Sequence, residues 1–149
     1  MAFLNISIKN KKGILADIDR QDYFRLGNIN SSRLTLYNFV FALGYNNGIP
    51  SDLDSPKESF IREEYVKEQS KRFMYSAAFF TTHEKDCIEN LEKISNTDIV
   101  FPLIDKYANT GFCVLADLMK KYDDQALALK LIGDMDEMNA KFLADFGEQ

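Results

Sequence analysis

The N-terminal segment 3–9 alternates between apolar and polar side chains from residue 4 onward. The two faces of this segment carry Leu4, Ile6 and Ile8, and Asn5, Ser7 and Lys9. A period of two predicts a half-buried strand. A lone strand leaves its backbone N–H and C=O groups without a ladder partner. We therefore expect the partner strand to come from a second copy of the chain, related by a two-fold axis.

The next two segments have helical periodicity. Residues 14–26 predict a short helix that ends at Gly27. The polar run that follows offers Asn30 or Ser31 as the N-cap of a second helix, which starts near Arg33. Apolar residues then recur at the i, i+3, i+4, i+7 spacing of a buried helix face, at Leu36, Phe39, Val40 and Leu43. Tyr37 and Phe41 widen this face.

Helices are also predicted for the rest of the chain. A turn-rich loop leads to a new helix start at residues 55–56, and an increasingly apolar stretch runs on to Phe80. A short helix is expected over residues 84–94, and Thr97 is expected to cap the next one. The last segment, residues 123–146, predicts an amphipathic helix whose apolar face carries Leu127, Leu131, Met135, Met138, Phe142 and Phe146.

Together these segments predict a mainly α fold with one N-terminal strand. The 149 residues suit one domain of ordinary size, and 46% hydrophobic residues are enough to build one core. We expect a single domain over residues 1–149, with the strand and first helices in 1–48 and a C-terminal amphipathic helix in 123–149.

Charge is distributed unevenly along the chain. Residues 1–50 carry six basic and three acidic side chains, a net +3, whereas 51–100 and 101–149 are each −4. The whole chain has a net charge of −5. If any part of the protein meets an anion, the first third is the best candidate.

Cysteine content and apolar run length bear on the compartment. Cys87 and Cys113 lie far apart in sequence, and no signal peptide precedes them, so we expect reduced thiols in a cytoplasmic protein. Both cysteines are expected to be small buried side chains. The uninterrupted apolar runs are much shorter than the roughly 18 residues of a membrane span, so we expect a soluble protein.

No motif predicts an enzyme. His83 and Cys87 are four residues apart and would share one helix face, but two ligands without further ones make a poor metal site. The chain has no phosphate-binding Gly-rich loop, nucleophile elbow or dinucleotide fingerprint. We expect no catalytic residue, no metal and no cofactor.

Roughly the first 45 residues have the layout of the ribbon-helix-helix family. This layout is a strand, a helix, a turn with Gly and Asn, and a second capped apolar helix. In that family two chains pair their strands, and the turn before the second helix sets backbone N–H groups against phosphate, as suits a helix N-terminus. On this interpretation DNA phosphates would meet Lys9, Lys11, Lys12, Arg25, Asn30, Ser31 and Arg33. The alternative is a well-capped core helix with no ligand.

Over residues 4–119 the chain also resembles the DndE family, small proteins of bacterial DNA phosphorothioation (DNA sulfur modification) systems. The matching features are Asn30 and Arg33, Lys57 and Glu58, Tyr75 and Ala77, and Asp98, Ile99 and Gly111. The chain departs from that family at Lys106, Tyr107 and Asn109, where its members tend to have His.

The resemblance implies a non-enzymatic accessory protein that forms a homo-oligomer, a dimer or tetramer. It also implies binding to duplex DNA, with a preference for nicks, beside sulfur-transfer and ATPase proteins in a bacterial defence or restriction-modification setting.

Two other functions stay open from the residues alone. The chain is an alternative candidate for a structural adaptor that binds only protein, or for a ribbon-helix-helix repressor that reads DNA sequence through Asn5, Ser7 and Lys9. The apolar face of the last helix suits an adaptable contact with a partner or a second copy, through Leu131, Met135, Met138 and Phe142.

Overall fold

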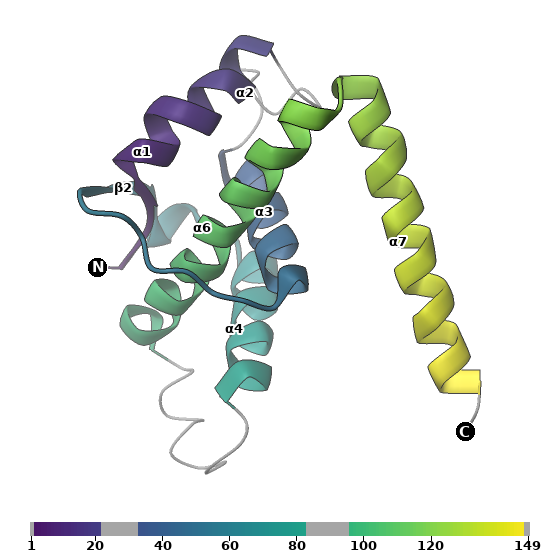
Figure 1. The fold of residues 1–149 in the computed structure, drawn as a ribbon. Coiled ribbons are helices and arrows are strands. Elements are labelled where there is room, and N and C mark those ends of the chain that lie inside the picture. Colours follow the sequence, from purple (N-terminus) through teal and green to yellow (C-terminus); the bar gives the residue numbers. More distant parts are fainter. Residues whose placement is uncertain (1, 22–32, 83–95, 148–149) are drawn as a thin grey trace. The chain divides into compact units, whose positions relative to one another are not determined.

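A computed structural model of the chain describes residues 2–21, 33–82 and 96–147 (Figure 1). This part of the protein is mainly helical, as the sequence predicts, and it contains one two-stranded antiparallel sheet that pairs the N-terminal strand with a later one. The chain forms two compact units, Met1–Leu115 and Ala116–Gln149.

The N-terminal strand is followed directly by helix. β1 spans Phe3–Ser7, and α1 (Ile8–Asn10), the π-helical segment η1 (Lys11–Leu15) and α2 (Ala16–Gln21) continue from it. Ser7 ends the strand because its hydroxyl accepts a hydrogen bond from the Asn10 N–H at 3.1 Å, which caps α1. The predicted strand is confirmed, although it is two residues shorter than the alternating pattern.

The partner of β1 lies in the same chain. β2 (Lys57–Arg62) pairs with it in the antiparallel sense, with Phe3 opposite Arg62 and Ser7 opposite Lys57. The expectation of a ladder from a second copy is therefore wrong for this edge of β1. The helix start predicted at residues 55–56 is also wrong, because β2 occupies that stretch.

A β-bulge explains why β2 does not show simple alternation. Leu4 pairs with Ile61 and Asn5 with Ser59, so Phe60 is an extra residue on β2. Such a bulge bends the strand and re-aims the extra side chain. The segment that follows, η3 (Glu63–Tyr65), leads into α4 (Glu68–Thr82).

Helix α3 (Arg33–Asn47) lies at the centre of the first unit. The ring of Phe41 packs 5.4 Å from Phe73 of α4 and 6.4 Å from Tyr107 of α6 (Thr97–Lys121), so α3 contacts both helices. The structure confirms a helix over the residues that follow Arg33, as the sequence predicts. The core around these three helices includes Leu36, Tyr37, Val40, Phe41, Met74, Phe101, Ile104, Phe112 and Leu115.

Two glycines allow α3 and α6 to touch through their backbones. A Cβ on Gly44 would lie 1.7 Å from the Tyr107 carbonyl oxygen, and one on Gly111 would lie 1.6 Å from the Val40 carbonyl oxygen. Both distances are far below van der Waals contact, so any larger side chain would separate the helices. This crossing sets the spacing of the core.

Helix α6 begins at Thr97, and its cap is the residue before the predicted one. The Asn96 side chain, rather than Thr97, accepts the Asp98 N–H at 2.9 Å. By length and composition α6 is apolar enough to span a membrane, and half of its apolar 18-residue window is buried inside the protein.

The second unit contains α7 (Asp124–Gly147), whose range confirms the predicted C-terminal helix. The Asp123 carboxylate accepts the Ala126 N–H at 2.8 Å and so forms the N-cap. Charged side chains at a spacing of three and four form a polar stripe along this helix: Lys130, Asp134, Glu137 and Lys141.

Candidate nucleic-acid interface

Three of the predicted phosphate-binding residues are exposed side chains of α1 and η1. Lys9 forms an ion pair with Asp54 at 3.6 Å, with 80% and 65% of the two side chains exposed. Lys11 forms an ion pair with Glu58. Lys12 has no ion pair with any residue of the described ranges. Exposed pairs of this kind contribute only about 0–1 kcal/mol, so a phosphate can replace the carboxylate.

Arg33 is held more firmly. Its Nη1 and Nη2 atoms donate to Oδ1 and Oδ2 of Asp19, each at 2.8 Å, so the guanidinium is bound through two parallel hydrogen bonds. This pair joins α2 to the first residue of α3. Arg25, Asn30 and Ser31 lie outside the described residues, so of the anion site expected there only Arg33 has a described position.

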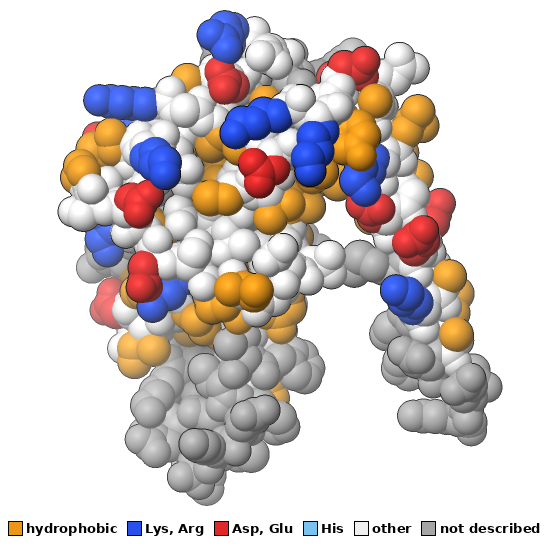
Figure 2. All heavy atoms as spheres, viewed as in Figure 1, with side chains coloured by type: hydrophobic (Ala, Val, Ile, Leu, Met, Phe, Trp, Pro, Cys, Tyr) orange, Lys and Arg blue, Asp and Glu red, His pale blue; other side chains and the backbone are white. Residues whose placement is uncertain are grey.

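Acidic side chains lie among the basic ones. Figure 2 shows Lys and Arg interspersed with Asp and Glu over the described part of the face in view. The positive charge of the first third is therefore partly neutralised by carboxylates from later in the chain, such as Asp54 and Glu58.

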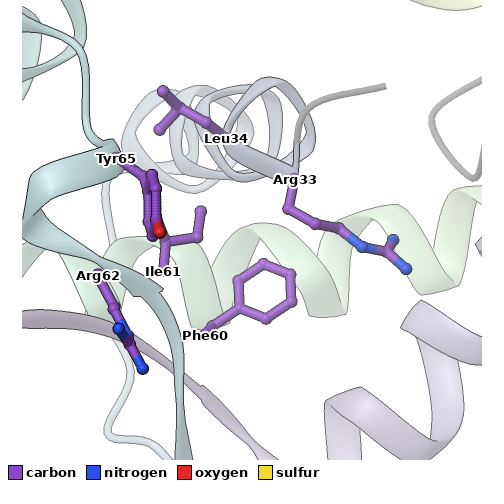
Figure 3. Close-up of a pocket in the computed structure, with 6 residues that line it drawn as sticks. All are labelled: Arg33, Leu34, Phe60, Ile61, Arg62 and Tyr65. Carbon is purple, nitrogen blue, oxygen red and sulfur yellow. The ribbon is translucent and has the colours of Figure 1, made fainter. Parts of the chain in front are cut away.

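A pocket of about 390 Å³ opens beside Arg33. Residues from the start of α3, from the bulged end of β2 and from η3 line it: Arg33, Leu34, Phe60, Ile61, Arg62 and Tyr65. In Figure 3 Leu34, Phe60, Ile61 and Tyr65 gather around its centre, with the two arginines on opposite sides. No sequence pattern indicates this pocket, because residues 57–62 have the pattern of a helix start and not of a bulged strand.

A buried carboxylate on α6 is a second feature that the sequence did not predict. Asp105 is only 3% exposed. Its Oδ1 accepts the Asn5 N–H at 2.8 Å and the Tyr37 hydroxyl at 2.5 Å, and its Oδ2 accepts the Asn5 side-chain amide at 2.8 Å. The carboxylate thus links β1, α3 and α6 through one side chain.

Burial dominates the ionisation of this group. Desolvation raises the pKa of the Asp105 carboxyl, while hydrogen bonds from Tyr37 and Asn5 and the positive charge of Lys57 oppose the rise. Desolvation also raises the pKa of the Tyr37 hydroxyl well above its usual value, and the negative charge of Asp105 adds to that rise. The tyrosine therefore stays protonated and remains a hydrogen-bond donor to Asp105.

A second polar cluster fixes the loop that precedes β2. The Asn109 side chain accepts from the Asn10 amide at 2.8 Å and donates to the Ser51 hydroxyl at 2.9 Å and the Asp52 carbonyl at 3.2 Å. Lys106 adds an ion pair with Asp52 at 2.9 Å. Asn109 thus connects α1, the loop and α6. Next to this cluster a pocket of about 260 Å³ is lined by Asp52, Leu53, Ser55, Lys57, Pro102, Asp105 and Lys106.

The polar face of β1 is not the free surface that the alternation predicts. Ser7 is 1% exposed and caps α1, and the Asn5 side chain donates to Asp105 and to the Phe3 carbonyl. The prediction of an outward face is therefore wrong for Ser7, and the amide of Asn5 is already in use. Lys9 alone of the three is an exposed side chain.

The predicted contact face of α7 is partly described. Met135 is 67% exposed and Leu131 is half-buried, whereas the side chains of Met138 and Phe142 lie outside the described part. The other exposed large apolar side chains of this helix are Leu129, Ile132 and Leu143.

The remaining candidates concern thiols and metals. Cys113 is exposed, which corrects its expected burial. His83 and Cys87 fall outside the described residues. Within the described ranges no group of three or more His, Cys, Asp or Glu side chains is placed to hold a metal ion.

Comparison with known proteins gave no relatives: no family model, no curated protein and no solved structure matches the chain.

Proposed function

We propose that this protein is a non-enzymatic accessory of a DNA phosphorothioation or related genome-modification or defence system in the bacterial cytoplasm. It acts as a homo-oligomer beside sulfur-transfer and ATPase proteins, and it binds intact or nicked duplex DNA through backbone phosphates. The resemblance to the DndE family motivates the proposal. The observation that supports it best is the exposed group of Lys9, Lys11 and Lys12 on α1 and η1.

The lysine group has the properties of a surface that meets a phosphate backbone without reading sequence. Ion pairs occupy Lys9 and Lys11, but these are surface pairs of small net free energy. Each lysine that moves from a carboxylate to a phosphate releases a condensed counterion from the DNA. Phosphate contacts of this kind position a protein on the duplex and carry no base information.

The test is DNA binding across a salt series. Fluorescence anisotropy with intact and nicked duplexes of one sequence measures the dissociation constant of the wild type and of the Lys11→Glu/Lys12→Glu variant. We expect the logarithm of affinity to fall linearly with the logarithm of salt concentration, and the variant to reduce that slope by about 2, since each lost phosphate contact removes about 0.9.

The matched control carries the same charge change elsewhere. Lys120→Glu/Lys121→Glu alters two exposed lysines at the end of α6 and should leave the slope unchanged. Absence of DNA binding at low salt, or an equal loss in both variants, would overturn the proposal.

A protein-only adaptor remains the second candidate, and the exposed apolar side chains of α7 favour it. Ile132, Met135 and Asn139 follow the three-four spacing of a heptad repeat, with Asn139 at a core position. A single core Asn is typical of helices that pair with a second copy in one register. The occupant proposed for this face is therefore α7 of another copy.

The oligomeric state tests this second candidate. Sedimentation analysis should give a smaller species for Ile132→Lys/Met135→Lys and an unchanged one for Glu137→Lys, which lies on the polar stripe. A monomeric wild type at all concentrations would rule out pairing through α7. A dimer that ignores DNA at every salt concentration would favour the adaptor over the accessory.

A further inference from the structure

The pocket beside Arg33 combines an apolar interior with two positive charges. The bulge places Phe60 between the core and the pocket, and its ring lies 6.1 Å from the buried Tyr37 ring at a tilt of 36°. Tyr65 lines the same pocket, although 65% of its surface is exposed. The pocket therefore offers two aromatic rings to a planar ligand.

The two arginines differ in how they are held. Asp19 fixes the Arg33 guanidinium through two hydrogen bonds, which orients the side chain. Within the described ranges no other side chain accepts from the remaining N–H groups of Arg33. The Arg62 guanidinium lies 3.6 Å from Glu64, and 62% of its side chain is exposed. A loose pair of this kind can open to admit a phosphate.

We propose that this pocket binds one unstacked nucleotide of a nucleic-acid strand, with the base against Phe60 and Tyr65 and the phosphate on Arg62. The inference rests on the proposed function and adds to it the form of DNA that the protein engages. Base stacking on aromatic side chains and phosphate contact to arginine are how proteins hold single strands.

Size and position favour a nucleotide. A volume of about 390 Å³ is near the lower end of the roughly 300–1,000 Å³ typical of ligand pockets, which suits one base with its phosphate. The lysine group reaches the same strand, because Lys11 pairs with Glu58 of β2, two residues from Phe60. A DNA strand that inserts a nucleotide here would also pass these lysines, whereas a phosphotyrosine peptide would not need them.

The first measurement compares a blunt duplex with the same duplex carrying one unpaired terminal nucleotide. The wild type should bind the second DNA more tightly. Tyr65→Ala should remove that advantage, a loss of about tenfold, because base stacking contributes roughly 1–3 kcal/mol and 1.4 kcal/mol is tenfold. Tyr65→Phe keeps the ring and should keep the advantage.

Charge is tested separately. Arg62→Gln should weaken binding of the unpaired nucleotide, and Arg72→Gln, an exposed arginine on α4, is the matched control. Lys11→Glu/Lys12→Glu should weaken both duplexes alike, which separates the pocket from the lysine group.

The second measurement uses deoxyadenosine monophosphate alone, followed through the NMR resonances of Phe60 and Tyr65. Saturable binding that Tyr65→Ala removes, together with no duplex binding at any salt, would keep the pocket and reject the proposed function. Duplex binding with no advantage for the unpaired nucleotide, and no effect of Tyr65→Ala, would overturn the pocket alone. Saturation by O-phosphotyrosine but not by the nucleotide would also overturn it, in favour of a phosphopeptide.

Discussion

Gly111→Ala tests the closest backbone approach in the core. The new Cβ would lie 1.6 Å from the Val40 carbonyl oxygen, and ordinary contact begins near 3.4 Å, so α3 and α6 would have to separate locally by about 1.8 Å. The obstacle is backbone, which cannot rotate away as a long side chain can. The separation would loosen packing around Tyr107 and Phe41, whose rings meet across these helices.

The expected magnitude combines two opposing effects. Overpacking a core costs about 1–3 kcal/mol and occasionally more, and we place this case above the range because neither backbone can give way. Replacing Gly by Ala inside a helix returns about 1 kcal/mol. The expected net loss in the free energy of unfolding is about 3 kcal/mol, or a fall in Tm of about 6–12 °C for a chain of this size.

Urea unfolding followed by circular dichroism gives this free energy, provided that the m-value is unchanged. Gly13→Ala is the control, since nothing lies within 4 Å of its added Cβ, and it should stabilise the protein by about 0.5–1 kcal/mol. Gly44→Ala should resemble Gly111→Ala, and the double variant should lose less than the sum because one separation accommodates both methyl groups. A Gly111→Ala protein as stable as Gly13→Ala would refute the close crossing.

Three further substitutions test the buried polar groups by the same unfolding assay. Tyr37→Phe should cost about 2 kcal/mol by removing a donor to an ionised carboxylate. The pKa of the Asp105 carboxyl is raised in the folded protein, so the folded state protonates this carboxyl before the unfolded state does as the pH falls. The stability lost in Tyr37→Phe should therefore be largest above the raised pKa, where the carboxyl is ionised, and should shrink towards pH 3.8. A loss of stability that does not depend on pH would contradict the assignment. Asn109→Ala should cost about 2–3 kcal/mol by leaving the Asn10 amide and the loop without partners, and an unchanged stability would show that water replaces them. Ser7→Ala removes the cap of α1 and should cost about 1 kcal/mol, whereas no loss would mean that the cap contributes nothing.

Local pattern was sufficient for the helices whose signals are local. The spacing of apolar residues predicts α3 after Arg33 and α7 after residue 123, because both patterns depend on residues within a turn or two. The mainly α fold and the N-terminal strand follow from the same kind of evidence.

The sheet could not be predicted in the same way, because the pairing of β1 with β2 joins residues fifty or more positions apart. The extra residue Phe60 shifts the alternation by one position, and the remaining pattern is easily mistaken for a helix. The pocket was missed for the same reason, since Phe60, Arg62 and Tyr65 depend on the course of β2.

Asp105 shows a different limit. In sequence it is one acidic residue on a helix, where a solvated position is the usual outcome. Its burial depends on Asn5, one hundred residues away, and on Tyr37. No pattern in the sequence near Asp105 indicates that its carboxylate accepts three hydrogen bonds from distant residues.

Block charge proved equally incomplete as a guide to the surface, and this leads to a last prediction. Lys9 and Lys11 belong to the positive first third, but their partners Asp54 and Glu58 belong to the negative second block. A phosphate must therefore compete with a carboxylate for each lysine. If the accessory function is correct, Asp54→Asn/Glu58→Gln should raise DNA affinity at constant salt, by up to about fivefold for each pair, since exposed pairs contribute about 0.2–1 kcal/mol.

The control for this prediction is Asp117→Asn, which releases Lys120 from a comparable exposed pair at 3.9 Å on α6. It changes the net charge by one unit without touching the lysine group. An affinity that rises equally with Asp117→Asn would mean that only net charge matters, and an affinity unchanged by Asp54→Asn/Glu58→Gln would show that DNA does not meet Lys9 and Lys11. Only a selective rise identifies these two lysines as contacts, because then the carboxylates act as competitors for them.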